Sequence, residues 1–130
     1  MRKLQQGVLV LAAGALLTLA STQGALADSG SGTLPVGGNI CVGPFFSNGT
    51  SIELDGQVTN NVIANPKWTI SQSPDNTTYT VVFKDHAFAV TADIRRTDHP
   101  TLFPGYFLSC LKNDQTVSVD FTISIGPGQF

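Results

Sequence analysis

The 130-residue sequence is poor in the residue types that most often carry chemistry. It has two cysteines, two histidines, one methionine and one tryptophan, and 12% of its residues are charged. No Cys-x-x-Cys, His-x-His or Gly-x-Ser-x-Gly pattern occurs in it. The usual sequence signs of a zinc site, a dithiol redox centre and an α/β-hydrolase nucleophile are therefore missing. We expect no metal, no cofactor and no enzymatic activity.

Basic residues are also scarce, which limits the class of partner. The chain has seven Lys and Arg against nine Asp and Glu. Without Arg2 and Lys3 the balance is five minus nine, or −4, and the charges are spread along the chain without runs. Nucleic acid and anionic membranes require a basic face, so we expect neither as a partner. Mild mutual repulsion favours a monomer.

One long apolar run occurs, over residues 8–20, and it has the features of an export signal. It follows Arg2 and Lys3 and precedes Ala-Leu-Ala at 25–27, a small-x-small cleavage pattern. A run of about 13 residues is too short to cross a bilayer, which takes about 20. Residues 1–27 are therefore predicted to be a cleaved signal peptide, and the mature protein is predicted to be secreted.

The two cysteines lie in the predicted mature chain, at Cys41 and Cys110. In an oxidising compartment an even count predicts a disulfide, and two cysteines allow one pairing. Closing a loop of about 70 residues should stabilise the fold by about 4 kcal/mol in the chain-entropy model.

Hydrophobic residues alternate with a period of two, which is typical of β-strands. We expect a flexible Gly- and Ser-rich lead-in over 28–38 and a single domain over 39–130. Asn48-Gly49 predicts a hairpin, Pro74-Asp75-Asn76 a tight turn, and Gly43-Pro44 a bulge or an edge. Strands are predicted over 39–47, 50–58, 66–72, 78–84, 87–95, 105–112 and 115–125.

The alternation also predicts which side chains face the core. In 105–112 it places Tyr106, Leu108 and Cys110 inward and Phe107 outward. On the other strands the predicted inward residues are Ile52, Leu54, Val58, Trp68, Ile70, Tyr79, Val81, Phe83, Phe88, Val90, Ala92, Ile94, Val117, Val119, Phe121, Ile123 and Ile125.

About seven short antiparallel strands with turn signals between them predict an all-β sandwich. Pro104-Gly105-Tyr106 followed by Cys110 resembles the start of the penultimate strand of immunoglobulin-like domains. The spacing of Tyr106 from Cys110 is four residues rather than two, and Trp68 lies farther from Cys41 than in antibodies. The resemblance implies an immunoglobulin-like β-sandwich with one disulfide.

The candidate catalytic groups are two histidines, each preceded by an aspartate: Asp85-His86 and Asp98-His99. Together they would form a metal site, or one histidine would act as a base for Ser109. Both pairs also fit ordinary turns, where Asp is favoured. A small secreted hydrolase or metal-dependent enzyme using His86 and His99 is therefore the alternative function. Glu53 and Asp55 lie on the same face of one predicted strand. Two carboxylates at such a spacing occur in glycosidases, but the solvent-exposed face of an ordinary strand is the simpler interpretation.

Aromatic residues give the leading functional hypothesis. Phe45, Phe46, Phe103 and Phe107 lie in loops or out of phase with the predicted core faces. Meeting on one face, they would form a recognition surface for an extracellular protein or glycan. A second alternative is a protease inhibitor that presents the loop 96–104. Asn48 and Asn76 also match the N-glycosylation acceptor pattern.

Overall fold

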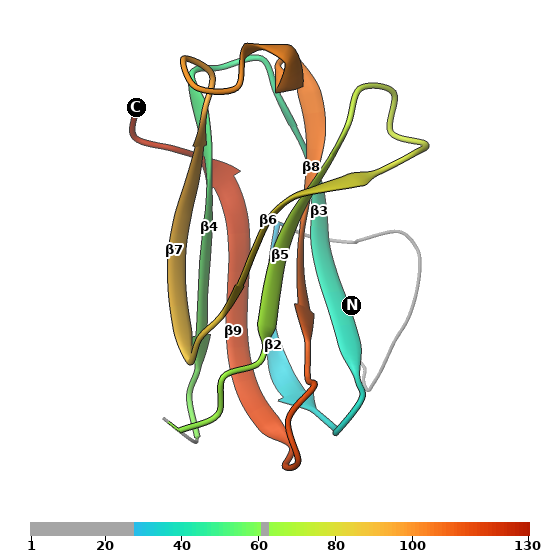
Figure 1. The fold of residues 1–130 in the computed structure, drawn as a ribbon, viewed down its shortest axis with the longest axis vertical. Coiled ribbons are helices and arrows are strands. Elements are labelled where there is room, and N and C mark those ends of the chain that lie inside the picture. Colours follow the sequence, from blue (N-terminus) through green and yellow to red (C-terminus); the bar gives the residue numbers. More distant parts are fainter. Residues whose placement is uncertain (1–27, 61–62) are drawn as a thin grey trace.

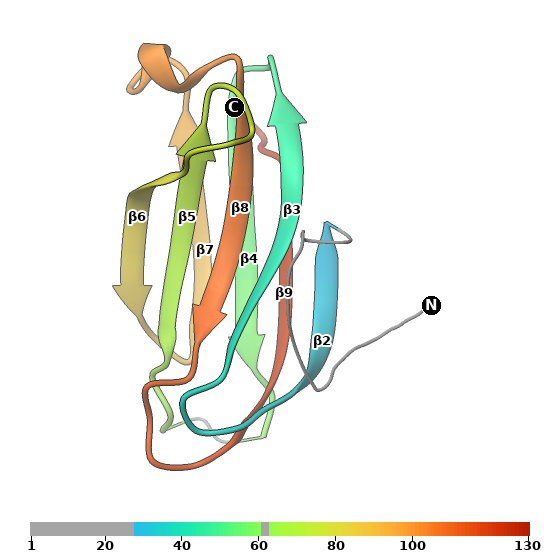
Figure 2. The same cartoon turned by 90° about the vertical axis from the view of Figure 1, so that its right-hand side faces the viewer.

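The structure, a computed structural model, describes residues 28–60 and 63–130. The predicted signal peptide lies outside the described residues. Two four-stranded antiparallel sheets pack face to face (Figure 1, Figure 2), with a single 3-10 turn among the described residues. No helix in the described part is long and apolar enough to span a membrane. The elements are β2 (Ser29–Leu34), β3 (Asn39–Ser47), β4 (Ser51–Val58), β5 (Lys67–Ser73), β6 (Thr80–His86), β7 (Ala89–Arg95), η1 (Pro100–Leu102), β8 (Gly105–Lys112) and β9 (Val119–Pro127).

The strand order confirms the all-β sandwich but differs from the immunoglobulin topology. One sheet has the order β2-β9-β4-β7 and the other β3-β8-β5-β6. Of the strands that follow one another in the chain, β5 and β6 are the one pair that is hydrogen-bonded within a sheet. Immunoglobulin sheets contain several such pairs. Eight strands that alternate between the sheets in this way form a jelly roll.

The predicted flexible lead-in contains a strand instead. β2 pairs with β9 from Ser29 opposite Ser124 to Leu34 opposite Val119, and Leu34 is buried. As an edge strand, β2 obtains its hydrogen bonds from β9 and needs few large side chains. Its Gly- and Ser-rich sequence therefore carries no alternation, although it is ordered by its neighbour.

Two turn predictions had different outcomes. Asn48-Gly49 connects strands of different sheets, so it is a crossing between the sheets and not a hairpin. Arg96 Nη1 holds this crossing through the backbone oxygens of Asn48 and Gly49, at 3.3 and 3.4 Å. The 74–76 segment forms the predicted turn, between β5 and β6.

The core lies between the sheets and is centred on Trp68, which is fully buried. Its indole N–H donates to the Ala87 carbonyl at 2.7 Å. Gly56 lies against the indole ring, where a Cβ would come within 2.3 Å of Trp68 Cζ3. The other residues predicted to face inward on β4, β5, β7 and β9 are buried. Phe88 and Val117 were also predicted to face inward, but they precede β7 and β9 in the chain and are 43% and 44% exposed.

On β8 the predicted phase is wrong. Phe107 and Leu111 are fully buried, whereas Tyr106, Leu108 and Cys110 are partly exposed and lie on the outer face. Both phases of this strand contain large apolar residues, so alternation alone could not choose between them. On β6, Val81 also faces outward, where the pairing with β5 contains an irregularity.

Candidate functional site

The outer face of the sheet β3-β8-β5-β6, which faces the viewer in Figure 2, has exposed aromatic and aliphatic side chains where a solvated face is normally polar. We define the aromatic patch as Phe46, Tyr79, Val81, Tyr106 and Leu108. In the register, Phe46 lies opposite Tyr106. Ser71 of β5 lies between Val81 of β6 and Leu108 of β8. The patch therefore has members on β3, β8 and β6, with Ser71 of β5 between them, and it lies toward the end of the sheet where the β5–β6 turn is.

Phe46 and Tyr106 form a ring pair at the β3 edge of the patch. Their ring centroids are 5.0 Å apart with the planes tilted by 57°, and Phe46 is 52% exposed. Such a cross-strand aromatic pair contributes about 0.5–1 kcal/mol to stability. That gain does not require the rings to be on the solvent side of the sheet.

A bulge in β3 directs Phe46 outward. Between the paired positions Val42 and Phe45, β3 has one residue more than β8. Cys41 and Phe46 are an odd number of residues apart, so in a regular strand they would face opposite sides. The bulge brings both to the outer face and turns Phe45 inward. Gly43 has φ +110°, and a Cβ there would lie 2.7 Å from the Phe107 carbonyl, so the bulge requires glycine.

Tyr79 adds a third ring at the β5–β6 turn. Burial raises the pKa of the Tyr79 hydroxyl, with smaller contributions from the nearby Tyr106 and Asp75. Its hydroxyl donates to the Asn76 side-chain oxygen. Asp75 organises the same turn by accepting from the Thr77 amide at 3.1 Å and hydroxyl at 2.7 Å, which lowers the pKa of Asp75 to about 2.

The predicted Cys41–Cys110 disulfide is confirmed, but it lies on the outer face instead of in the core. The two cysteines are direct cross-strand partners on β3 and β8, with Cα atoms 4.0 Å apart. It joins the same two strands that carry Phe46 and Tyr106.

Of the four phenylalanines predicted to form a recognition surface, Phe46 alone is largely exposed. Phe103 and Phe107 are buried and pack on each other with centroids 5.2 Å apart, and Phe45 packs partly buried against the core. Phe103 follows the short turn η1 and closes one open end of the sandwich, where apolar loop residues replace missing sheet. Tyr79 and Tyr106 were missed because both were assigned to the core.

The four residues of the alternative enzyme site do not converge. His86 ends β6 at one end of the sandwich, and its Nε2 lies 2.8 Å from Asp114 Oδ2. His99 precedes η1, at the opposite end (Figure 2). Within residues 28–60 and 63–130 no group of three or more His, Cys, Asp or Glu side chains is arranged to hold a metal.

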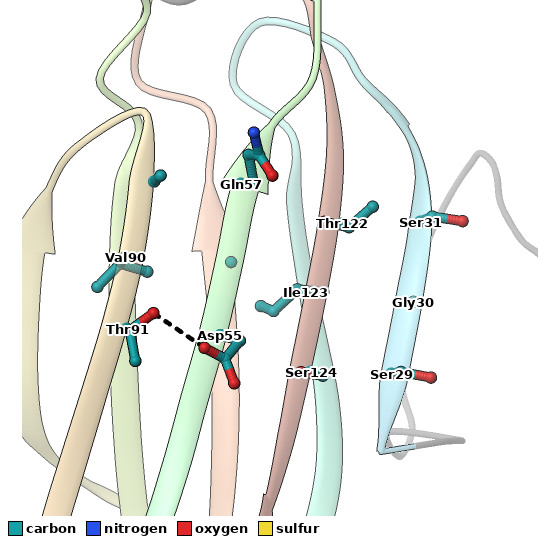
Figure 3. A pocket seen from close by; sticks show the side chains of 12 residues that line it. Ser29, Gly30, Ser31, Asp55, Gln57, Val90, Thr91, Thr122, Ile123 and Ser124 are labelled. Carbon is teal, nitrogen blue, oxygen red and sulfur yellow. Dashed lines mark hydrogen bonds between the residues drawn. The ribbon is translucent and has the colours of Figure 1, made fainter.

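The other sheet has a shallow polar groove of about 670 Å³ on its outer face (Figure 3). Its rim is rich in small hydroxyl residues, and the Thr91 hydroxyl donates to Asp55 at 2.9 Å. The outward residues that line it are Ser29, Ser31, Asp55, Gln57, Ala89, Thr91, Thr122 and Ser124. No aromatic ring lines this groove.

Glu53 lies between this groove and the beginning of β4, directly opposite Asp93 of β7. A hydrogen bond with Asp55 is the main cause that raises the pKa of Glu53 to about 7, followed by burial and the charges of Asp55 and Asp93. Glu53 thus holds its proton more strongly than a free carboxyl does, on a strand face with three acidic side chains.

Comparison with known proteins gives a structural likeness alone. No protein-family model matches the chain, and a search of curated proteins gives no match. Among solved structures, the Yersinia pseudotuberculosis-derived mitogen is similar, with a TM-score of 0.56 and 10% sequence identity. The alignment covers 78% of this chain and 86% of the mitogen. At this identity the likeness supports the fold alone.

Proposed function

We propose that this protein is a small secreted, non-enzymatic β-sandwich that recognises an extracellular protein or glycan through the aromatic patch. The observation that carries the proposal is the exposed Phe46–Tyr106 pair on a sheet face that the core does not use. Aromatic side chains bury large areas at little entropic cost, and tyrosine is enriched among the residues that dominate binding energy.

The support for the proposal is geometric. A bulge with a required glycine turns Phe46 outward, and the disulfide fixes β3 against β8 beside it. Tyr79 is held by its own turn. Binding surfaces with rings fixed in this way lose little freedom when a partner docks.

The test is retention of the exported protein on immobilised extracellular polysaccharides, neutral and charged, and on surface proteins of the producing cell. The variant F46S/Y106S should lose retention at least about tenfold, since two aromatic contacts are worth more than 1 kcal/mol. The matched control is V36S/V117S, which removes two exposed apolar side chains outside the patch, 56% and 44% exposed. Thermal unfolding of each variant verifies that it is folded.

Two results would contradict the proposal. One is retention that survives F46S/Y106S but falls in V36S/V117S. The other is loss of the protein's biological activity in H86A/H99A with normal folding and retention, which would favour the enzyme alternative.

A further inference from the structure

All three lysines of the described chain lie on the outer face that carries the aromatic patch. We define the basic band as Lys67, Lys84 and Lys112. Lys67 alternates with buried Trp68, and Lys112 with buried Leu111, so both point outward. Lys67 is opposite Lys112, and Lys84 is opposite outward-facing Thr69. Charges that are scattered in the sequence thus meet on one face.

The fold does not use these lysines in ion pairs. Within the described residues, the one ion pair joins His86 to Asp114. The second carboxylate at this end, Asp85, accepts from the His86 amide at 2.9 Å. By contrast, Arg95 lies 3.4 Å from the centroid of the Phe130 ring, and Arg96 holds the crossing at 48–49. The arginines have internal roles, and the lysines are free for a ligand.

The Lys67–Lys112 pair is unfavourable for the sheet itself. Like charges directly opposite each other on neighbouring strands are destabilising, by a fraction of a kcal/mol to about 1 kcal/mol. His86 flanks Lys67 on the other side. Meanwhile Glu53, Asp55 and Asp93 lie on the outer face of the opposite sheet. A chain of net negative charge therefore presents the three lysines of its described part on the face that carries the aromatic patch.

The band and the patch lie on the same outer face, toward opposite ends of β8, and we call this face between and including them the strip. Lys112 and Tyr106 are six residues apart on this strand, which is about 20 Å at about 3.4 Å per residue. The Cys41–Cys110 disulfide, Thr69 and Ser71 lie between the two ends. The strip is the open face of a sheet and suits a polymer that lies along it.

We propose that the strip binds a polyanionic glycan, meaning a polysaccharide with repeated carboxylate, sulfate or phosphate groups. Lysines bind such groups as point charges. Sugar rings would stack on Phe46 and Tyr106, and their hydroxyls would reach the Thr69 and Ser71 side chains. This inference rests on the proposed function and specifies the chemistry of its ligand.

The experiment titrates the exported protein by calorimetry with polygalacturonate, dextran sulfate and neutral dextran, at low and at physiological ionic strength. The variant K67Q/K84Q/K112Q removes the charges, and K67R/K84R/K112R retains them as the matched control. We expect the Gln variant to bind both polyanions at least about tenfold more weakly with a reduced salt dependence, because fewer counterions are released. The Arg variant should stay within about threefold of wild type. F46S/Y106S should weaken binding while leaving the salt dependence unchanged.

Three outcomes would overturn the inference. Neutral dextran binding as tightly as the polyanions, with loss in F46S/Y106S alone, would retain the proposed function and reject the anionic ligand. Equal binding of a DNA duplex would show general polyelectrolyte attraction without glycan recognition. No binding to either polyanion would also reject the inference, and the retention panel above would then decide separately whether the patch has a neutral-glycan or protein partner.

Discussion

Replacing Gly56 with alanine is the sharpest test of how the two sheets pack. The added Cβ would lie 2.3 Å from Trp68 Cζ3 and 2.7 Å from two further ring carbons. Trp68 is fully buried, so the ring has no open space into which it can move. Either the indole tilts or β4 and β5 move apart.

The expected cost follows from these contacts. Overpacking a core site by one methyl group costs about 1–3 kcal/mol. Tilting the indole would also strain its 2.7 Å hydrogen bond to the Ala87 carbonyl, and a lost buried hydrogen bond adds about 1 kcal/mol. We therefore expect Gly56→Ala to lower the free energy of unfolding by about 2–4 kcal/mol.

Urea unfolding followed by tryptophan fluorescence, with circular dichroism for variants that lack Trp68, measures this change. Gly126→Ala is the matched control, because a Cβ there meets nothing within 4 Å. Adding Gly56→Ala to a Trp68→Phe background should cost at least about 1 kcal/mol less than in wild type, since the two sites are in contact. The reasoning is refuted if Gly56→Ala stays within about 0.5 kcal/mol of wild type.

Four further predictions concern stability. Cys41→Ala/Cys110→Ala should lose about 4 kcal/mol and about 15 °C or more in Tm, because the closed loop spans 69 residues; a loss below about 1 kcal/mol in calorimetry would contradict this. The pKa of Glu53 is raised from 4.5 to about 7, so its stabilising contribution is complete below pH 4.5 and is lost as pH rises through 7. Solvent screening keeps the effect small, and Glu53→Gln should flatten Tm against pH over this window. Asn113→Ala should cost about 2–3 kcal/mol, since the buried amide donates to two carbonyls. Ser109→Ala should be neutral or stabilising in the same urea assay, because its buried hydroxyl has no partner.

Local patterns predicted the strands well. The predicted segments 39–47 and 105–112 coincide with β3 and β8, and the bulge expected at Gly43-Pro44 is present. Alternation and turn residues are properties of a few neighbouring residues, and they determine where a chain can extend and where it must turn. The inward faces of β4 and β9 were predicted for the same reason.

The order of the strands could not be predicted in this way. Whether Asn48-Gly49 closes a hairpin or crosses between the sheets depends on which distant strands lie beside β3 and β4. The partner of β3 is β8 and the partners of β4 are β7 and β9, all of them well separated from β3 and β4 in the chain. β2 likewise exists because β9 offers it an unpaired edge. Sequence-local propensity carries no information on such pairings.

The candidate site was only partly predictable. Phe46 could be identified as one of two adjacent phenylalanines that alternation cannot both bury. Its partner Tyr106 is about 60 residues away, and the contact depends on the register of β3 with β8. The phase of β8 was misassigned because Tyr106 and Leu108 alternate as regularly as Phe107 and Leu111 do, and from the wrong phase Cys110 was expected to face the core. That expectation fails when a disulfide joins neighbouring strands of one sheet, since such a pair can lie on either face.

The bulge and the disulfide together explain why the patch exists. In a regular β3 paired through Cys41 and Cys110, Phe46 would point into the core and Phe45 would be exposed. The extra residue at the bulge reverses this order, so Phe46 meets Tyr106 on the side of the disulfide. Burial alone would have been satisfied by either phenylalanine. A glycine-dependent bulge is a costly way to choose between them unless the ring on the outer face has a use, and bulges occur preferentially where a side chain must be re-aimed for function.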